Sequence, residues 1–168
     1  NLDVPVSLQT FGVLFGGALL GFRRALLSVG LYVLMGAIGL PVFAFNQATQ
    51  QYGSGLQTIV GFSDGAISMG TTGGYIVGFI FAAALVGRLA ELGWDRHIGG
   101  SIGAMVLGNA VIYVIGVPWL MAARGWDLQT GLQFGFWGFV VGDAVKVAAA
   151  AGLLPVGWWL VNRRSSER

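Results

Sequence analysis

Five long, unbroken apolar runs constrain this chain more than any other feature of its sequence. They cover residues 4–20, 25–45, 72–89, 98–122 and 132–161. A helix needs about 20 apolar residues to cross a bilayer, with a range of about 17 to 25. Because the runs are continuous and do not alternate with polar residues, they favour helices over the strands of a membrane barrel. The sequence therefore predicts an all-α, polytopic transmembrane helix bundle with five spans, forming a single domain over residues 1–168.

The composition agrees with a membrane protein and excludes several chemistries. Hydrophobic residues make up 55% of the chain, charged residues 10%, and the mean hydropathy is +0.76, far from the balance of a soluble domain. With no cysteine and His97 as the single histidine, we expect no disulfide, no metal centre and no histidine-based catalytic triad. The chain also has no Gly-Lys-Ser/Thr nucleotide-binding sequence. We therefore expect no enzymatic activity, no cofactor and no nucleic-acid partner.

Positive charge is concentrated at three places along the chain. Seven of the nine cationic residues fall there: Arg23 and Arg24, then Arg88 and Arg96, then Arg163, Arg164 and Arg168. If successive runs cross the membrane in alternate directions, all seven face one side, which the positive-inside rule makes the cytoplasm. The opposite side receives Asp3, Asp64, Asp127 and Arg124. This pattern predicts an extracellular Asn1 and a cytoplasmic C-terminus, and an external start suggests that one more helix precedes Asn1.

The longest connection, residues 46–71, lies between the second and third runs and is rich in Gln, Ser, Gly and Thr. Loops of this length are usually either functional lids or disordered segments. Apolar residues such as Leu56, Ile59 and Val60 favour a packed lid on the external side.

Asp143 and Lys146 form an opposite-charge pair inside the last apolar run. Their three-residue spacing places them on one face of a helix. A charged residue at the centre of a span costs roughly 2.5 to 3.5 kcal/mol. The presence of two such residues is explained either if they neutralise each other or if they bind a polar ligand. Charged pairs in spans usually mark substrate pathways. A second interpretation is an ion-coupled small-solute carrier or proton relay in which these two residues titrate.

Several other polar residues are candidates for ligand contact, each with a structural alternative. Asn109 and Tyr113 are four residues apart and share a helix face, where the amide would bond either a neighbouring helix or a ligand. Thr72 is a plausible helix N-cap, but free amides at a helix start also receive carboxylates. Tyr75 could belong to the interfacial aromatic belt, and Gln9 could be a simple interfacial residue.

Taken together, five segments give the chain an end-to-end resemblance to the BioY family, the biotin-binding substrate subunits (S components) of energy-coupling factor (ECF) vitamin transporters. The segments are 4–10 (Val-Pro-Val-Ser-Leu-Gln-Thr), 36–44 (Gly-Ala-Ile-Gly-Leu-Pro-Val-Phe-Ala), 72–79 (Thr-Gly-Gly-Tyr-Ile-Val-Gly-Phe), Gly108-Asn109 with Tyr113, and 142–146 (Gly-Asp-Ala-Val-Lys). The resemblance implies a six-helix fold whose first helix is missing here, in a bacterial plasma membrane. It also implies uptake of biotin with a transmembrane coupling subunit and a pair of ATPases as partners.

The resemblance and the chemistry of biotin together suggest a binding site. A ureido group offers one carbonyl acceptor and two N–H donors, which a carboxylate, an ammonium and an amide can match. We therefore expect the polar head to contact Asp143, Lys146 and Asn109. The rings would pack on Tyr113 and Tyr75, and the tail would be closed over by Gln9, Thr72 and Gly73.

Overall fold

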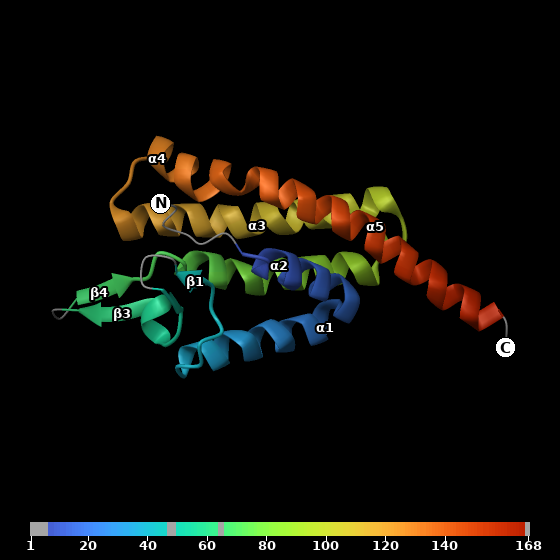
Figure 1. Ribbon diagram of the computed structural model, residues 1–168, viewed down its shortest axis with the longest axis horizontal. Helices are drawn as coiled ribbons and strands as arrows, with labels where there is room; N and C mark the ends of the chain where they lie inside the picture. Colours follow the sequence, from blue (N-terminus) through green and yellow to red (C-terminus); the bar gives the residue numbers. More distant parts are fainter. Residues whose placement is uncertain (1–6, 47–49, 64–65, 167–168) are drawn as a thin grey trace.

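The computed structural model describes residues 7–46, 50–63 and 66–166 as a bundle of long helices (Figure 1). The predictions that rest on Asn1, Asp3, Asp64 and Arg168 lie outside these ranges. The helices are α1 (Gln9–Ala37), α2 (Gly73–Glu91), α3 (Ile98–Arg124), α4 (Leu128–Leu132) and α5 (Gly138–Ser166), with 3₁₀ turns η1 (Leu56–Thr58) and η2 (Trp94–Arg96) and a π-helical turn η3 (Gln133–Trp137). The predicted helical membrane fold is confirmed.

Within the described ranges, four helical elements are long and apolar enough to cross a membrane, against the five spans predicted, and the difference lies in α1. The first two predicted spans form one element, α1, which breaks at Gly21 (φ 73°, ψ 174°) and doubles back on itself (Figure 1). Residues 9–20 reach only about 18 Å at 1.5 Å per residue, well short of the roughly 30 Å hydrocarbon layer. The second part ends at Ala37 and not at residue 45, because Gly39 (φ 106°) turns the chain out of the helix.

The end of α2 holds the break in α1. Glu91 Oε1 accepts the backbone N–H of Phe22 at 2.9 Å, so the first donor after the break has a partner, and Glu91 Oε2 is 3.0 Å from Arg88 Nη1. Gly87 lets the two backbones approach, since a Cβ there would lie 2.7 Å from the carbonyl carbon of Gly21. The fold of α1 thus depends on α2 having no side chain at this point.

We expect Gly87→Ala to lower the free energy of unfolding by about 1–3 kcal/mol, because the new methyl group meets backbone atoms that cannot move aside cheaply. Thermal unfolding in detergent would measure the change. Gly16→Ala is the matched control, because nothing lies within 4 Å of a Cβ at that position and alanine favours helix by up to about 1 kcal/mol. Equal stability of the two variants would contradict the close approach.

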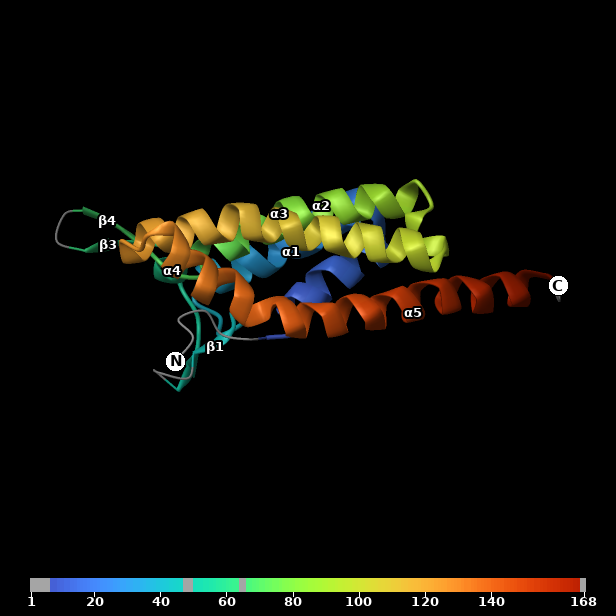
Figure 2. The ribbon, with the colours of Figure 1, turned by 90° about the horizontal axis from the view of Figure 1, so that it is seen from above.

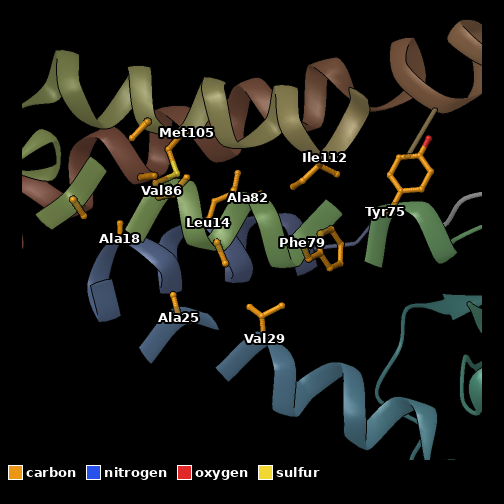
Figure 3. Packing of buried hydrophobic residues seen from close by; sticks show 14 of the residues in the cluster. Leu14, Ala18, Ala25, Val29, Tyr75, Phe79, Ala82, Val86, Met105 and Ile112 are labelled. Carbon is orange, nitrogen blue, oxygen red and sulfur yellow. The ribbon is translucent and has the colours of Figure 1, made fainter. Parts of the chain in front are cut away.

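Helix α2 forms the centre of the bundle, with α1 on one side and α3 on the other (Figure 3). It is the most buried of the described spans. In α2, 61% of an 18-residue apolar stretch is buried inside the protein, against 17% for the corresponding stretch of α1. Small side chains such as Ala82 and Ala83, both fully buried, let neighbouring helices pack closely. Leu27, Leu31 and Leu34 on α1 are exposed, as expected for a face in contact with lipid.

The connection between α1 and α2 forms two antiparallel hairpins at the end of the bundle where α2 begins (Figure 1). One pairs β1 (Phe45–Asn46) with β2 (Gln51–Tyr52), and the other pairs β3 (Val60–Ser63) with β4 (Ala66–Met69). The connection is anchored by Phe43 and Ile59, which are buried with Ile76 of α2, and by Trp119 of α3, whose Nε1 donates to Gly70 O at 2.9 Å. The role of residues 46–71 as a lid stays a prediction.

At the opposite end of the bundle, α5 is tied to the connection between α2 and α3. Trp158 Nε1 donates to Oδ2 of the buried Asp95, and the guanidinium of Arg96 lies 5.1 Å from the centre of the Trp158 ring. The break in α1, the end of α2 and the later part of α5 therefore meet at one end, and these are the places where the cationic residues gather.

Candidate substrate-binding pocket

A pocket opens among the first turn of α1, the first half of α2, the middle of α3 and the start of α5. About 50 Å³ of it is open to the centres of water molecules, and one water needs about 10–15 Å³, so it has room for a few. A mostly apolar pocket with a few converging polar groups is typical of small-molecule sites. The lining residues are Ser7, Gln9, Thr10, Phe43, Ala44, Thr72, Tyr75, Ile76, Phe79, Ile112, Tyr113, Phe139, Asp143 and Lys146.

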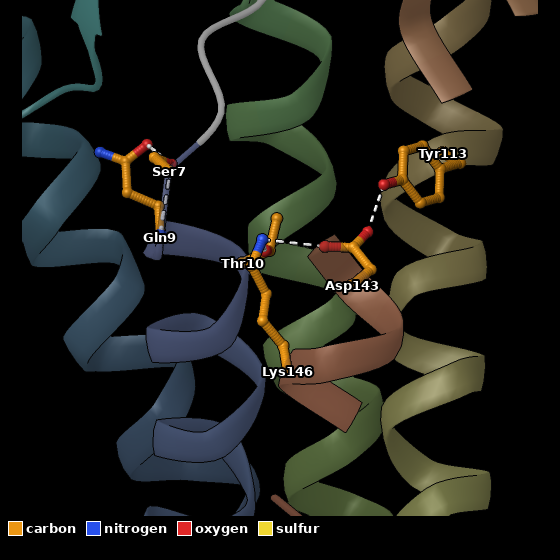
Figure 4. Close-up of polar contacts among 6 residues, drawn as sticks. All are labelled: Ser7, Gln9, Thr10, Tyr113, Asp143 and Lys146. Carbon is orange, nitrogen blue, oxygen red and sulfur yellow. Dashed lines mark hydrogen bonds and ion pairs between the residues drawn. The ribbon is translucent and has the colours of Figure 1, made fainter. Parts of the chain in front are cut away.

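The charged pair of α5 is the centre of a hydrogen-bonded network that lines the pocket (Figure 4). Lys146 Nζ lies 2.9 Å from Asp143 Oδ1 and 2.8 Å from Thr10 Oγ1, and the hydroxyl of Tyr113 donates to Asp143 Oδ2. The two charged side chains are only 13% and 8% exposed. The network joins α1, α3 and α5, and its paired charges make it neutral as a whole.

The pair still has bonding capacity for a ligand. An ammonium has three donors, and Lys146 uses two of them, to Thr10 and Asp143. A carboxylate has about four acceptor sites, and Asp143 uses two of them, for Lys146 and Tyr113. The pocket can therefore offer one further charged donor and further charged acceptors to a solute that presents both a carbonyl oxygen and N–H groups.

The π-helical turn η3 sets the position of this pair. The hydroxyl of Tyr75 on α2 donates to the carbonyl of Gly135 within the turn at 2.8 Å. The Tyr75 ring lies against Gly116 of α3, where a Cβ would lie 2.6 Å from it. Single π-helical turns widen a helix locally and are frequent at functional sites. Here the turn precedes α5 directly and brings Asp143 opposite Tyr113.

Six of the eight residues predicted from the sequence line the pocket: Gln9, Thr72, Tyr75, Tyr113, Asp143 and Lys146. All six also have hydrogen-bond partners within the protein, and those of Gln9 and Tyr75 lie outside the network of the charged pair. The Gln9 amide donates to Tyr32 Oη at 2.9 Å and to Val42 O at 3.3 Å, which ties the first turn of α1 to the chain beyond its second part. Tyr75 bonds Gly135, as described above.

Gly73 and Asn109 lie outside the pocket lining. Gly73 packs against the connection, since a Cβ there would lie 2.6 Å from Ile59 O. Asn109 is 9% exposed and lies one helical turn from Tyr113, away from the start of α5. Its Oδ1 is buried and has no hydrogen-bond partner among the described residues. A buried, unpaired amide oxygen is unusual in a folded protein, so Asn109 retains an acceptor for a donor that approaches.

Sequence reasoning missed Thr10, although it ends the segment 4–10 that carried the resemblance. The contact between Thr10 and Lys146 joins positions 136 residues apart, and no local spacing could reveal it. The apolar lining residues Phe43 and Phe139 gave no signal either, because both sit in apolar runs like most of their neighbours.

A membrane-embedded helix bundle with a small pocket over a buried, neutralised ion pair defines a protein that binds a small polar solute within the bilayer. Residues 1–163 match the model of the BioY family, and the chain belongs to this family. The resemblance drawn from the sequence is confirmed.

The chain is also similar to individual members with described functions. It is 35% identical over 148 residues to a biotin transporter BioY of Thermotoga maritima, covering 88% of this chain and 77% of that protein. A biotin transporter BioY of Rhizobium etli is 31% identical over 98% of this chain and 84% of its own. Among solved structures, the S-component for biotin from an ECF-type ABC transporter superposes with a TM-score of 0.75 at 25% identity, covering 92% of this chain and 76% of that one.

Proposed function

We propose that this chain captures biotin from outside the cell and takes part in its uptake as the substrate-binding subunit of an ECF-type ABC transporter. Membership of the BioY family and the functions of its relatives support the proposal. The observation that carries it is the buried pair of Asp143 and Lys146, which faces the pocket with unused donor and acceptor capacity.

Biotin matches the groups around the pocket. The ammonium of Lys146 donates to the ureido carbonyl, and the carboxylate of Asp143 accepts from a ureido N–H. Charge-assisted bonds of this kind are the strong ones in proteins. The sulfur-containing ring packs on Tyr113 and Tyr75, and the valerate tail extends toward Gln9 and Thr72. Asn109 and Gly73 join the site in a bound form that moves them closer to the ligand.

The ligand needs more room than the few waters that the pocket now admits, so its walls must move. The connection of residues 46–71 runs between the pocket-lining residues Ala44 and Thr72, and its Ile59 is buried together with Phe43, which also lines the pocket. We propose that this segment acts as the lid, because it joins two parts of the pocket lining, Phe43 and Ala44 before it and Thr72 after it, and lies outside the long helices. Opening and closing of such segments commonly limits binding and release.

Energy for transport comes from partners, a transmembrane coupling subunit and a pair of ATPases, because the sequence holds no nucleotide-binding motif. The protein resides in a bacterial plasma membrane. The cationic end of the bundle, near Arg88 and Arg96, faces the cytoplasm by the positive-inside rule. The C-terminus is then cytoplasmic, the pocket and the connection of residues 46–71 open to the outside, and Asn1 is extracellular.

The direct test is to purify the protein in mild detergent from cells supplied with biotin and to identify the retained small molecules by native mass spectrometry. We expect one biotin per chain, retained through purification and displaced by labelled biotin. A protein that retains no biotin and binds none on addition contradicts the proposal. If that protein instead carries pH-driven flux in liposomes without ATPases, the pair of Asp143 and Lys146 acts as an ion-coupled relay.

A further inference from the structure

We propose that Thr10 is a positioning residue for ligand binding: it directs the ammonium of Lys146 so that one N–H faces the pocket. The proposal rests on the function proposed above and adds a residue to it. Thr10 lies in the first turn of α1 and lines the pocket, and its Oγ1 accepts from Lys146 Nζ at 2.8 Å.

The need for such a residue follows from the chemistry of lysine. The ammonium is a compact point charge with three rotatable donors on a flexible stem. With Asp143 alone as a partner, it can turn freely about the carboxylate. A second fixed acceptor defines two of the three N–H directions, and the tetrahedral geometry then sets the third.

Thr10 is suited to be that second acceptor. Its side chain is β-branched and therefore stiff at χ1. The adjacent Gln9 is held by Tyr32 and Val42, which fixes the start of α1 from the other side. On the far side of the pair, Tyr113 holds the second oxygen of Asp143. The ammonium is thus oriented from α1 and the carboxylate from α3, while both side chains come from α5.

The test compares biotin affinity in Thr10→Val, which replaces the hydroxyl with a methyl group of similar size, and Thr10→Ser, which keeps the hydroxyl. We expect Thr10→Val to weaken binding about tenfold, in the range of one hydrogen bond to a charged group, and Thr10→Ser to stay within about threefold of the parent protein. Thr130→Val, in the short helix α4 outside the pocket lining, is the control for loss of a threonine hydroxyl and should leave affinity unchanged.

A double-mutant cycle with Lys146→Met separates positioning from other roles. If Thr10 acts through the ammonium, Thr10→Val has little further effect once the ammonium is gone. An equal loss of affinity with and without Lys146 overturns the proposal, because Thr10 then contacts the ligand directly or only supports the fold. Thermal unfolding of the ligand-free variants identifies the latter case.

The two proposals fail in different ways. If the unchanged protein binds no biotin, the proposed function fails and this inference fails with it. If the unchanged protein binds biotin and Thr10→Val binds it equally well, only the role of Thr10 is overturned.

Discussion

Asp143→Asn is expected to weaken biotin binding by about ten- to a hundredfold. The substitution keeps the shape of the side chain and an acceptor for Tyr113, but it removes the charge that strengthens a bond to a ureido N–H. Hydrogen bonds to charged groups are worth about 1.5–3 kcal/mol, and every 1.4 kcal/mol is a factor of ten in affinity. Equilibrium binding of labelled biotin to the purified variant measures the loss.

Asp127→Asn provides the matched control for this prediction. Asp127 lies between α3 and α4, outside the pocket lining, and hydrogen bonds from the Thr130 side chain and nearby backbone amides lower the pKa of its carboxyl. The same chemical change there should leave biotin affinity unaltered. Unchanged affinity in Asp143→Asn would mean that the carboxylate is not part of the binding site.

Lys146→Met is expected to lower the free energy of unfolding by about 3–5 kcal/mol, because it leaves the buried carboxylate of Asp143 without its counter-charge. Removing both charges is a different matter. Replacing a buried ion pair by neutral residues of similar volume is often neutral or stabilising, so Asp143→Asn combined with Lys146→Met should recover most of the loss. Unfolding of the ligand-free variants by heat or denaturant in detergent gives the comparison.

The double variant also separates two explanations of the pair. A purely structural ion pair predicts that the recovered protein binds biotin as the parent does. A ligand-binding pair predicts that stability returns while affinity remains at least tenfold lower, since neither charged partner of the ureido group is present. Full affinity in the stable double variant would therefore refute the proposed site.

The helical class of the fold and the place of the charged pair followed from the sequence, for a physical reason. Apolar runs of spanning length admit few structures in lipid, and Asp143 and Lys146 are costly wherever they occur in such a run. These constraints act locally, on hydropathy and on spacing along one helix. The spacing of Asn109 and Tyr113 on α3 likewise indicated a shared face, although only Tyr113 lines the pocket.

The features that escaped prediction depend on contacts between distant segments. The apolar runs predicted a reversal between residues 20 and 25, where α1 breaks at Gly21, but they gave no sign of Gly87 and Glu91, the residues of another helix that hold this break. The hydropathy pattern also indicated two spans of full length, whereas the described first part of α1, residues 9–20, is short. The π-helical turn before α5 was hidden for the same reason, since it depends on Tyr75 of α2.

The π-helical turn also has an evolutionary consequence. Each residue of an α-helix rotates the next by about 100°, so adding or removing one residue between Gly135 and Asp143 would swing both charges out of the pocket, toward lipid. A change in the length of the hairpins of residues 46–71 would not rotate the side chains of α5 about the helix axis. These hairpins can therefore vary in length. We therefore expect gaps among relatives to fall in that connection, and the stretch between Gly135 and Asp143 to keep a constant length while its side chains drift.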